Sequence, residues 1–464
     1  MKKISISIIC LLLVLSACTG LKKVGKKVST KPNIIILLAD DLGWNDVGFH
    51  GGDAITPNLD KLAEDGLQMN RFYMNNSCTP SRIGLLTGKH PGRFGLGPDV
   101  GVITPKRRNG LPIEVATLPE KLAEAGYKER ACFGKWHLGH SHVKFHPLNR
   151  GFNYFYGLYG GMVGYFYHKR KGQLDWHRNF EPCYDKGYAT DLIGNEAVHF
   201  IDKEANKADP FFMYVSFTAP HVPLEAKQEH LDMYGYDPKL GPYKGENDTK
   251  IKNKILGRGN SARQTYLAMV TGMDEAIGRI LNALERQGIA DNTMVLFLSD
   301  HGGPLKAGGD NDPLKGGKGT FYEGGVRVPA IIKWTKGLPT GKTESTPISY
   351  TDIFETLQEL TGVKKKAETD GIDVMPILKG DVNDPERYIY LGQSALIKKE
   401  WKLVENELYN ISYDLSEEND LAKKFPEVYK EMKEKLAELS SSIEKKVEIF
   451  ENHKVQPEWK MLDY

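Results

Sequence analysis

The chain has 464 residues, of which 40% are hydrophobic and 26% are charged, and its formal net charge is +2. This composition is typical of a globular protein, and the length fits one large domain plus a smaller one. A chain of this length buries enough surface to fold without disulfides or a structural metal, so a bound metal would serve chemistry. Near neutrality argues against nucleic-acid binding, which needs a strongly basic surface, but is compatible with a local basic pocket for a small anion.

Residues 1–17 have the pattern of a lipoprotein signal peptide. Lys2 and Lys3 give a positively charged start, and a mostly apolar stretch runs from Ile4 to Leu15. A membrane-spanning anchor is the alternative, but this stretch falls short of the roughly 20 apolar residues that a spanning helix needs. No other part of the sequence contains an apolar stretch of spanning length.

The signal peptide ends in a predicted site for a lipid anchor. Leu15-Ser16-Ala17-Cys18 is typical of a lipoprotein cleavage site, so we expect cleavage before Cys18 and a lipid on that residue. Lipidation with more than one acyl chain would hold the protein on a membrane, with the polar, Lys-rich residues 18–31 as a tether. Because no acidic run follows Cys18, we expect the periplasmic side, with exposure at the cell surface as the alternative.

Besides Cys18, three cysteines remain after cleavage, namely Cys78, Cys132 and Cys183. An odd number of thiols in an exported protein leaves at least one of them unpaired. A bridge between Cys132 and Cys183 is compatible with the sequence, which does not establish it. Cys78 stays unpaired in that arrangement and needs an explanation of its own.

Four continuous apolar runs predict strands that are buried on both faces, as in a parallel sheet. They are Asn33–Ala39, Phe211–Phe217, Met294–Leu298 and Val328–Trp334. Apolar residues with helical spacing lie between these runs, at Pro57–Gly66, Leu118–Gly126 and Ser261–Gln287. Strands that alternate with helices predict an α/β fold with a doubly wound, mostly parallel sheet flanked by helices.

The character of the sequence changes after about Asp370. Three short runs predict antiparallel strands, at Arg387–Leu391, Trp401–Glu405 and Glu407–Ser412. A charged amphipathic helix follows at Pro426–Lys446. We therefore divide the chain after the tether into a main domain at 32–370 and a smaller C-terminal α+β subdomain at 371–464. We expect this subdomain to cover one edge of the main sheet.

Polar side chains that can ligate a metal follow three of the predicted strands. They are Asp40 and Asp41, His221, and Asp300 and His301. Ligands of open parallel sheets bind beyond the carboxyl ends of the strands, so the fold gathers these groups at one rim. A single Asp after a strand is usually a turn or a helix cap, but here three strand ends agree. Carboxylates gathered in one place need a cation, and oxygen ligands suit Ca²⁺ or Mg²⁺. His301 is an unusual ligand for calcium, and its alternative role is to support the ligands.

A compact motif, Cys78-Thr79-Pro80-Ser81-Arg82, precedes Leu86-Thr87-Gly88. At these residues the chain resembles the formylglycine-dependent sulfatases of the alkaline-phosphatase-like superfamily. Their maturation motif is Cys or Ser, any residue, Pro, any residue, Arg, with Leu-Thr-Gly downstream. The alternative for Cys78, a buried structural thiol, is disfavoured by the nearby Pro80 and the charged Arg82. If a helix begins near Ser81, its amino terminus also favours an anion beside Cys78.

Further segments match the family's pattern in the same order, so the resemblance runs from about Asn33 to Asp420. The matching segments are Gly134–Gly139, Ala219–Pro223, Ser299–Gly303, Gly317–Gly325, Asp370–Asp373 and Glu407–Asn410. One departure is His301, which stands where many relatives have Asn. The resemblance implies the alkaline-phosphatase-like version of the predicted fold, with 32–370 as a sulfatase catalytic domain.

The resemblance also implies a modified nucleophile and a bound cation. Cys78 would be oxidised by a formylglycine-generating maturation enzyme to 3-oxoalanine (formylglycine). The hydrated aldehyde would attack sulfur and later release sulfate by returning to the aldehyde. Ca²⁺, or Mg²⁺, would lower the pKa of the attacking group and hold a sulfate oxygen. The metal ligands would be Asp40, Asp41, Asp300, His301 and the modified Cys78.

Cationic side chains and histidines receive roles from the same resemblance. Arg82, Lys135 and Lys318 would stabilise the negative charge on sulfate oxygens in the transition state. A lone lysine is usually a solvated surface charge, but a Trp beside Lys135 and glycines on both sides of Lys318 disfavour ordinary helical surface. His221 would protonate the departing alcohol and His137 would take the proton of the nucleophile, and these two roles can be exchanged.

We expect the substrate to be a sulfated carbohydrate, a poly- or oligosaccharide that the enzyme attacks from its end, as in bacterial polysaccharide breakdown. Segments 41–50 and 56–60 are most similar to the arylsulfatase B (N-acetylgalactosamine-4-sulfatase) branch of the family. The stretch 152–167 is dense in Tyr and Phe, and Trp176 follows it. These aromatics, with Arg150 and the cationic residues 168–170, could bind sugar rings and their acidic groups. The alternative is a Tyr-rich segment packed in the core.

Two other functions remain as alternatives. A phosphoester or phosphonate hydrolase of the same superfamily is one, because a fold alone does not fix the reaction. A two-zinc phosphatase, however, would need more His and Asp ligands at the strand ends than the sequence offers. A catalytically silent glycan-binding lipoprotein is the other, and the intact motifs argue against it.

Overall fold

The computed structural model describes residues 31–94, 110–244 and 257–443 of the chain. The predicted signal peptide, Cys18 and all of the tether except Lys31 lie outside these residues, as do residues 444–464 of the predicted subdomain. Among the helices of the described residues, none has both the length and the apolar character needed to cross a membrane.

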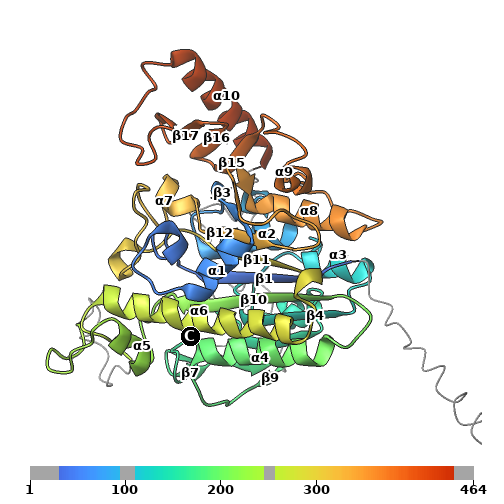
Figure 1. Cartoon of the computed structure of the whole chain (residues 1–464). Coiled ribbons are helices and arrows are strands. Elements are labelled where there is room, and N and C mark those ends of the chain that lie inside the picture. Colours follow the sequence, from blue (N-terminus) through green and yellow to red (C-terminus); the bar gives the residue numbers. More distant parts are fainter. Residues whose placement is uncertain (1–30, 95–109, 245–256, 444–464) are drawn as a thin grey trace, which may run out of the picture.

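A mixed sheet, ten-stranded over the described residues, forms the centre of the molecule (Figure 1). Its strand order is β13-β2-β12-β11-β1-β10-β4-β5-β8-β9. The central strands run parallel and are β11 (Thr293–Ser299), β1 (Asn33–Asp40), β10 (Phe211–Pro220), β4 (Glu129–Lys135) and β5 (Tyr154–Leu158). The outer strands are shorter, and antiparallel pairs occur among β13 (Lys342–Glu344), β2 (Leu67–Met69), β12 (Ala330–Lys333), β8 (His177–Arg178) and β9 (Glu181–Pro182). The predicted mostly parallel sheet is confirmed.

Strand β1 shows why the central strands lack apolar–polar alternation. All eight of its residues are buried. Ile36 pairs with Tyr214 of β10 on one side and with Leu296 of β11 on the other, and these three side chains belong to the hydrophobic core of one face. Ile35 and Leu37 belong to the core of the opposite face. A strand that is buried on both faces needs no alternation, and β1 is apolar at every position from Ile34 to Ala39.

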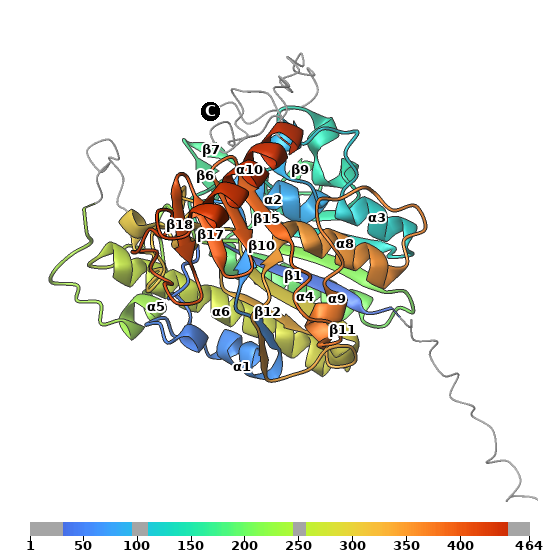
Figure 2. The same cartoon turned by 90° about the horizontal axis from the view of Figure 1, so that it is seen from above.

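Helices cover both faces of the sheet, as in a doubly wound α/β fold (Figures 1 and 2). The helices that pack on one face are α1 (Pro57–Asp65), α4 (Ala189–Glu204) and α6 (Ala262–Arg286). Those on the opposite face are α2 (Cys78–Thr87), α3 (Leu118–Glu124), α8 (Tyr350–Thr361) and α9 (Met375–Lys379). Short elements complete the domain, namely β3 (Phe72–Tyr73), β6 (Lys169–Arg170), β7 (Gln173–Leu174), α5 (Gln228–Met233), α7 (Glu323–Val326) and β14 (Ile348–Ser349).

The C-terminal part is a small antiparallel sheet with one long helix. Its elements are β15 (Tyr388–Gly392), β16 (Ala395–Lys398), β17 (Trp401–Val404), β18 (Glu407–Asn410) and α10 (Pro426–Ile443). One face packs on α10, where Leu403 meets Leu436, and the other packs on β3 and α7, where Ile389 belongs to a cluster with Tyr73 and Val326. In Figure 1 this part lies beyond β12, on the side of the main sheet away from β4. The sequence predicted three of these strands and missed β16, a short strand between two tight turns.

The three cysteines of the described residues are all free. Cys132 is buried within β4, whereas Cys183 is only partly buried, just after the edge strand β9. The bridge between them that the sequence allowed is therefore not formed.

Candidate active site

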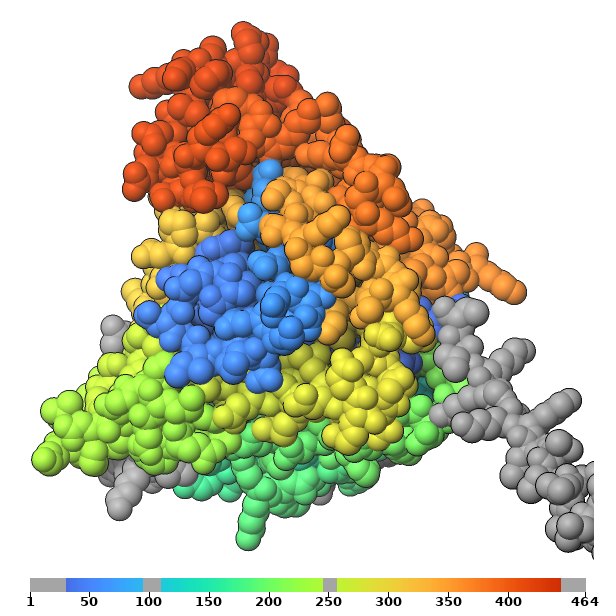
Figure 3. Space-filling model, in the orientation of Figure 1, coloured from blue at the N-terminus to red at the C-terminus, as the bar shows by residue number. Residues whose placement is uncertain are grey.

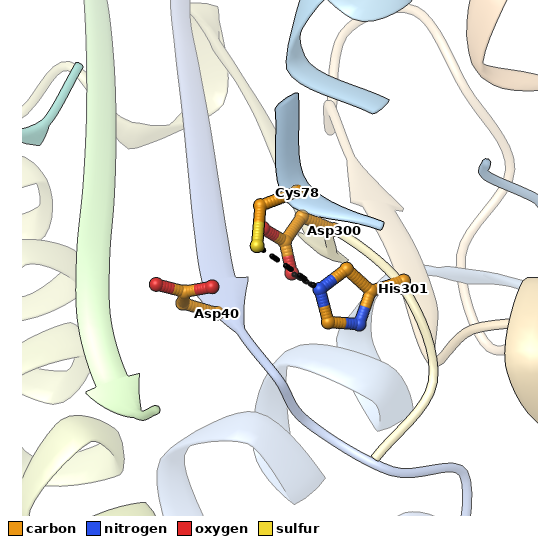
Figure 4. Close-up of side chains that lie close together, drawn as sticks. All are labelled: Asp40, Cys78, Asp300 and His301. Atoms are coloured by element: carbon orange, nitrogen blue, oxygen red, sulfur yellow. Dashed lines mark hydrogen bonds and ion pairs between the residues drawn. The ribbon is translucent and has the colours of Figure 1, made fainter. Parts of the chain in front are cut away.

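The carboxyl ends of four neighbouring strands meet beside the amino terminus of α2 (Figure 4). Asp40 ends β1 and Lys135 ends β4, while polar residues directly follow β10 and β11. The residues after these strand ends are Asp41, His221, Asp300 and His301. The structure thus brings the polar residues of the three predicted strand ends to one rim, and it adds Lys135 from a fourth strand.

Cys78 is the first residue of α2, so this helix begins three residues earlier than predicted. Ser77 before it is extended, and Pro80 lies in the first turn, where a missing N–H breaks no helical bond. The amino terminus of a helix favours negative charge and lowers the pKa of a thiol. The fold therefore places Cys78 where an anionic nucleophile is stabilised.

The candidate metal ligands form two overlapping groups, in each of which the ligand atoms lie within 4.8 Å of one another. The first group is Asp40, Cys78, Asp300 and His301 (Figure 4). The second group is Asp40, Asp41, Cys78 and His221. All of these side chains are buried. The five predicted ligands are thus gathered around one point, with His221 beside them.

One carboxylate of this site, that of Asp40, is incompletely satisfied by the described part of the protein. Asp40 Oδ1 is buried and makes no hydrogen bond within the described part of the chain, and the nearest ion-pair partner is Arg82 Nη2 at 3.7 Å. Asp300 Oδ1 accepts a bond from the Asp41 amide at 3.1 Å and lies 3.4 Å from His301 Nε2. Buried carboxylates without partners are costly, and a cation among them removes that cost. The donor set therefore fits a hard divalent cation.

His301 has the orientation of a metal ligand. Its Nδ1 lies 2.9 Å from the Gly302 carbonyl oxygen, a contact that requires the proton on Nδ1. Nε2 faces Asp41 Oδ1 at 3.1 Å and Cys78 Sγ at 3.4 Å, and in the neutral ring this atom carries the lone pair that a cation would bind. Metal-binding histidines commonly donate their other ring N–H to a carbonyl in this way. This geometry fits direct ligation better than the alternative supporting role.

Two lysines point their ammonium groups into the site. Lys135 Nζ lies 2.6 Å from Asp40 Oδ2, and neither side chain is exposed. Lys318 Nζ lies 2.6 Å from Asp41 Oδ1 and 3.8 Å from Cys78 Sγ, and 28% of its side chain is exposed. Lys135 is therefore part of the floor of the site, whereas Lys318 stands between Cys78 and solvent.

Arg82 is turned inward, away from solvent. Its Nε and Nη2 donate to Asp300 Oδ2 at 3.1 and 2.9 Å, and its Nη1 donates to the Lys135 carbonyl and to Ser216 Oγ. The side chain is fully buried. The guanidinium thus ties α2 to the ends of β11, β4 and β10, and its contact with the reacting region runs through Asp300.

The two predicted catalytic histidines flank Cys78. His137 Nδ1 lies 3.4 Å from the hydroxyl of Thr79, the residue after Cys78. A Cβ on Gly161 would lie only 2.8 Å from His137 Nε2, so the glycine allows close approach of the chain to this ring. His221 Nε2 lies 3.7 Å from Asp41 Oδ2, and its Nδ1 lies 2.6 Å from the Val222 carbonyl.

Burial and neighbouring charges shift the pKa values of the acidic groups of the site in opposite directions. Burial raises the pKa of Asp40 to about 7, although Lys135 opposes the shift. Burial also raises the pKa of Asp41, but His221, His301 and other cations outweigh it and hold that pKa below its usual range. Burial likewise disfavours the Cys78 thiolate, yet Lys135 and Lys318 lower the pKa of the thiol well below its ordinary value.

The pKa values of the two histidines shift in opposite directions. Burial lowers the pKa of His137 to about 3, so its ring is neutral near pH 7. Burial also disfavours the charged form of His221, but Asp41 and Asp40 outweigh it and raise the pKa of His221. The site therefore holds a neutral His137 beside Cys78 and a His221 whose charged form the neighbouring carboxylates favour.

Some residues of the site carry no sequence signal. Ser216 Oγ, in the apolar strand β10, accepts a hydrogen bond from Arg82. Tyr165 donates its hydroxyl to the carbonyls of Thr218 and His221 at 2.6 and 2.8 Å and so fixes the segment that carries His221. Nothing in the local pattern around either residue distinguishes it from an ordinary core residue.

Most of the aromatic stretch predicted to bind sugar rings lies in the core instead. Buried members of the set are Phe152, Phe155, Tyr156, Tyr159, Tyr165 and Trp176. Arg150 is also buried and donates to the carbonyls of Leu111 and Val115. Among the aromatics of this stretch, Tyr167 is well exposed, at 62%. The structure favours the alternative, a Tyr-rich segment that packs on the domain.

Residues 32–363 match the sequence model of the sulfatase family, which covers most of the chain. The chain belongs to the sulfatase family. Membership confirms the resemblance predicted from the Cys78 motif, and with it the predicted enzyme class, a sulfuric ester hydrolase. The mixed, mostly parallel sheet flanked by helices is the fold expected of that family.

Named relatives and a solved structure agree with this family. N-acetylgalactosamine-6-sulfatase of Mus musculus is 35% identical over 412 residues, which cover 83% of this chain and 73% of the relative. Arylsulfatase J of Mus musculus is 33% identical over 370 residues, 78% of this chain, but these cover only 58% of that longer relative. The crystal structure of Ps i-CgsB in complex with k-i-k-neocarrahexaose is 34% identical, with a TM-score of 0.76 over 89% of this chain and 94% of that chain.

Proposed function

We propose that this sulfatase removes sulfate from a sulfated carbohydrate and that Cys78, converted to formylglycine, supplies the nucleophile. The observation that carries the proposal is the position of Cys78. It is the first residue of α2 and lies within 4.8 Å of the ligand atoms of two carboxylates and His301, with Lys318 Nζ 3.8 Å away. A reacting sulfate ester placed there meets a nucleophile, a cation site and a fixed positive charge together.

A divalent cation, Ca²⁺ or Mg²⁺, would polarise a sulfate oxygen and favour the ionised nucleophile. Asp40, Asp41, Asp300 and His301 would hold it, together with the modified Cys78. The buried Asp40 Oδ1, which lacks a hydrogen-bond partner in the described residues, supports this assignment. Arg82 fixes Asp300 through two hydrogen bonds and so orients one of the ligands.

The formylglycine side chain would provide a nucleophile that releases sulfate by returning to its aldehyde, which an ordinary thiol does not. Conversion of Cys78 requires a formylglycine-generating enzyme as a partner. Lys318 would bind a sulfate oxygen directly, because its ammonium group is the partly exposed one. Lys135, which is ion-paired with Asp40 on the floor of the site, would stabilise the negative charge that develops on the sulfate group.

His221 would donate the proton that the departing sugar hydroxyl needs, and His137 would accept the proton of the nucleophile. The raised pKa of His221 supports its role as the proton donor, because the charged ring carries the proton to be given. Geometry supports it too, because His137 contacts Thr79, the neighbour of Cys78, whereas His221 stands beside Asp41.

The carbohydrate class follows from the relatives. N-acetylgalactosamine-6-sulfatase is named for a sugar, and Ps i-CgsB was crystallised with neocarrahexaose, an oligosaccharide. We further propose that the enzyme acts at the end of a sulfated poly- or oligosaccharide. The sequence of residues 1–18 supports an exported lipoprotein on the periplasmic side of a membrane.

The test measures inorganic sulfate and phosphate release side by side from a panel of sulfated and phosphorylated mono- and oligosaccharides. Cys78→Ala is the inactive variant, and Cys183→Ala, which removes a partly exposed thiol, is the matched control. Mass spectrometry of the peptide that contains Cys78 reports conversion of the thiol to the aldehyde. Sulfate release that survives in Cys183→Ala and is lost in Cys78→Ala and with a chelator supports the proposal.

Other outcomes would count against it. Phosphate release alone would show that the protein hydrolyses phosphate esters instead of sulfate esters, and the fold assignment would still hold. An unconverted Cys78 in the native host, with glycan binding but no release, would favour the silent glycan-binding lipoprotein.

A further inference from the structure

A buried ion network joins the C-terminal sheet to the segment that carries Lys318. Lys402, in β17, is fully buried, and its Nζ lies 2.8 Å from Glu323 Oε1 and 3.0 Å from Glu417 Oε1. Glu323 is the first residue of α7, whereas Glu417 follows β18 in the C-terminal part. Tyr73 donates its hydroxyl to Glu323 Oε2 at 3.1 Å, so a third segment joins the network.

The network holds one end of the segment 315–323, and the backbone at Glu417 holds the other. At its far end, the Glu323 amide donates to Glu417 Oε2 at 2.6 Å. At its near end, Lys315 Nζ donates to the Glu417 carbonyl at 2.9 Å and lies 4.1 Å from the centre of the Tyr322 ring. Figure 3 shows the C-terminal residues resting on the gold-coloured surface that this part of the chain forms. One residue of the C-terminal part, Glu417, thus fixes the start and the end of the segment.

The middle of the same segment contacts the active site. The Lys318 amide donates to the Gly303 carbonyl at 3.2 Å, and the Gly319 amide donates to the Asn76 carbonyl at 2.8 Å, two residues before Cys78. These contacts and the anchored ends bring Lys318 Nζ to 2.6 Å from Asp41 and 3.8 Å from Cys78 Sγ. The lysine side chain is long and flexible, so its position depends on where the backbone is held.

We infer that Lys402, with Glu323 and Glu417, is a positioning group for Lys318. The C-terminal sheet thereby sets the geometry of the reaction, although Lys402 touches no reacting atom. The inference rests on the proposed role of Lys318 in binding a sulfate oxygen.

Physical chemistry gives the expected size of the effect. Removing the ammonium group of Lys402 leaves the buried Glu417 carboxylate without its cation, whereas Glu323 keeps Arg327 at 3.3 Å. Movement of Glu417 away from Glu323 would shift the end of segment 315–323 whose amide, at Glu323, donates a hydrogen bond to Glu417. A displacement of about 1 Å at a catalytic group can cost about 100-fold in rate.

The test compares four full-length proteins with converted Cys78: the wild type, Lys402→Met, Lys318→Ala and the double variant. We expect Lys402→Met to lower kcat/KM for sulfate release by about 10- to 100-fold. In the Lys318→Ala background the same change should cost less than about twofold, because the group it positions is gone. Equal losses in both backgrounds would overturn the inference.

Arg387→Met is the matched control. Arg387 is largely buried and pairs with the fully buried Asp352 of α8, so it also ties the C-terminal part to the main domain, away from segment 315–323. We expect a similar fall in Tm and an unchanged kcat/KM. If Lys402→Met does not fold, Glu417→Gln decides the question, since its single amide oxygen cannot face both Lys402 and the Glu323 amide. A loss of kcat/KM that disappears in the Lys318→Ala background supports the inference, and equal losses in both backgrounds overturn it.

A second measurement separates this inference from the proposed function. Binding of inorganic sulfate, measured by calorimetry, needs no turnover. Lys402→Met and Lys318→Ala should weaken sulfate binding by a similar factor, and the double variant by no more than either. A wild type that releases no sulfate from any sugar would reject the proposed function, whereas unchanged sulfate binding in Lys402→Met would reject the positioning role.

Discussion

Lys135 and Asp40 form an ion pair in the interior of the protein, with Nζ 2.6 Å from Oδ2 and neither side chain exposed. The two residues end strands β4 and β1, which are separated in the sheet by β10. The pair satisfies only one oxygen of Asp40, because Oδ1 makes no hydrogen bond within the described residues. Lys135 therefore occupies one oxygen of the Asp40 carboxylate, and the other oxygen is left for a cation.

This arrangement predicts that a divalent cation stabilises the fold. Calcium at about 100 times its Kd should raise the free energy of unfolding by about 3 kcal/mol, and a chelator should remove that gain. Asp40→Asn should abolish most of the calcium-dependent rise in Tm, measured by calorimetry. Asp46→Asn is the control, because Asp46 is equally buried but lies outside the ligand groups. The same Tm with calcium and with chelator would exclude a cation site.

The loss of activity in a His221 variant should depend on the leaving group of the substrate. His221→Asn should slow sulfate release from a sugar sulfate by about 100- to 10,000-fold, because the departing alkoxide then lacks a proton donor. The loss should shrink with an aryl sulfate whose phenol leaves without protonation. His230→Asn, which changes a buried histidine paired with Glu275, is the control and should retain activity. A loss that is independent of the leaving group would assign His221 to binding instead.

His90 should make the stability of the fold depend on pH. Burial lowers the pKa of this histidine from 6.5 to about 4, so the folded state binds its proton less readily than the unfolded chain does. The stabilising contribution is present above pH 6.5 and is lost as the pH falls towards 4. The loss amounts to about 3 kcal/mol. Urea unfolding between pH 7 and pH 4.5 checks this, and His90→Gln should make the fall in stability less steep, although other buried histidines still contribute to it. Parallel profiles for the two proteins would contradict it.

Gly84 allows α2, the helix that begins with Cys78, to pack closely on α8. A Cβ on this residue would lie 1.8 Å from Cε2 of Tyr350, which is fully buried. Gly84→Ala should therefore lower stability by about 1–3 kcal/mol and reduce sulfate release, since α2 must shift. Thermal unfolding measures the first effect. Gly164→Ala, where the nearest atoms to a Cβ are 3.6 Å away, should change Tm little.

Much of the main domain follows from local sequence. The apolar run after Asn33 becomes β1, and the polar residues after three such runs meet because parallel strands share a carboxyl edge. The Cys78 motif identified the family because its residue types and spacing are tied to one chemistry. The apolar runs and the Cys78 motif are local patterns in the sequence. The meeting of the strand ends follows from the geometry of parallel sheets and needs no knowledge of side-chain contacts.

Features that depend on long-range contacts could not be predicted. The direction of Arg82 is decided by Asp300 and Ser216, which lie 218 and 134 residues further along the chain. Lys402 reads as an ordinary strand residue, and only the fold brings Glu323 to it. The sequence left sugar binding and core packing open for the aromatic stretch after Phe152, because a buried and an exposed Tyr-rich segment have the same composition.

Two residues of the site have a backbone conformation that few side chains tolerate. Asp41 and His137 adopt φ values of 73° and 57°, in the left-handed region, where a residue other than glycine costs about 1–2 kcal/mol. The surrounding sheet maintains this strain before any substrate arrives. At these positions the backbone conformation that places the side chain for activity lowers the stability of the fold. Glycine at either position would relieve the backbone and at the same time remove a side chain that the site uses, so the strain is retained together with the chemistry.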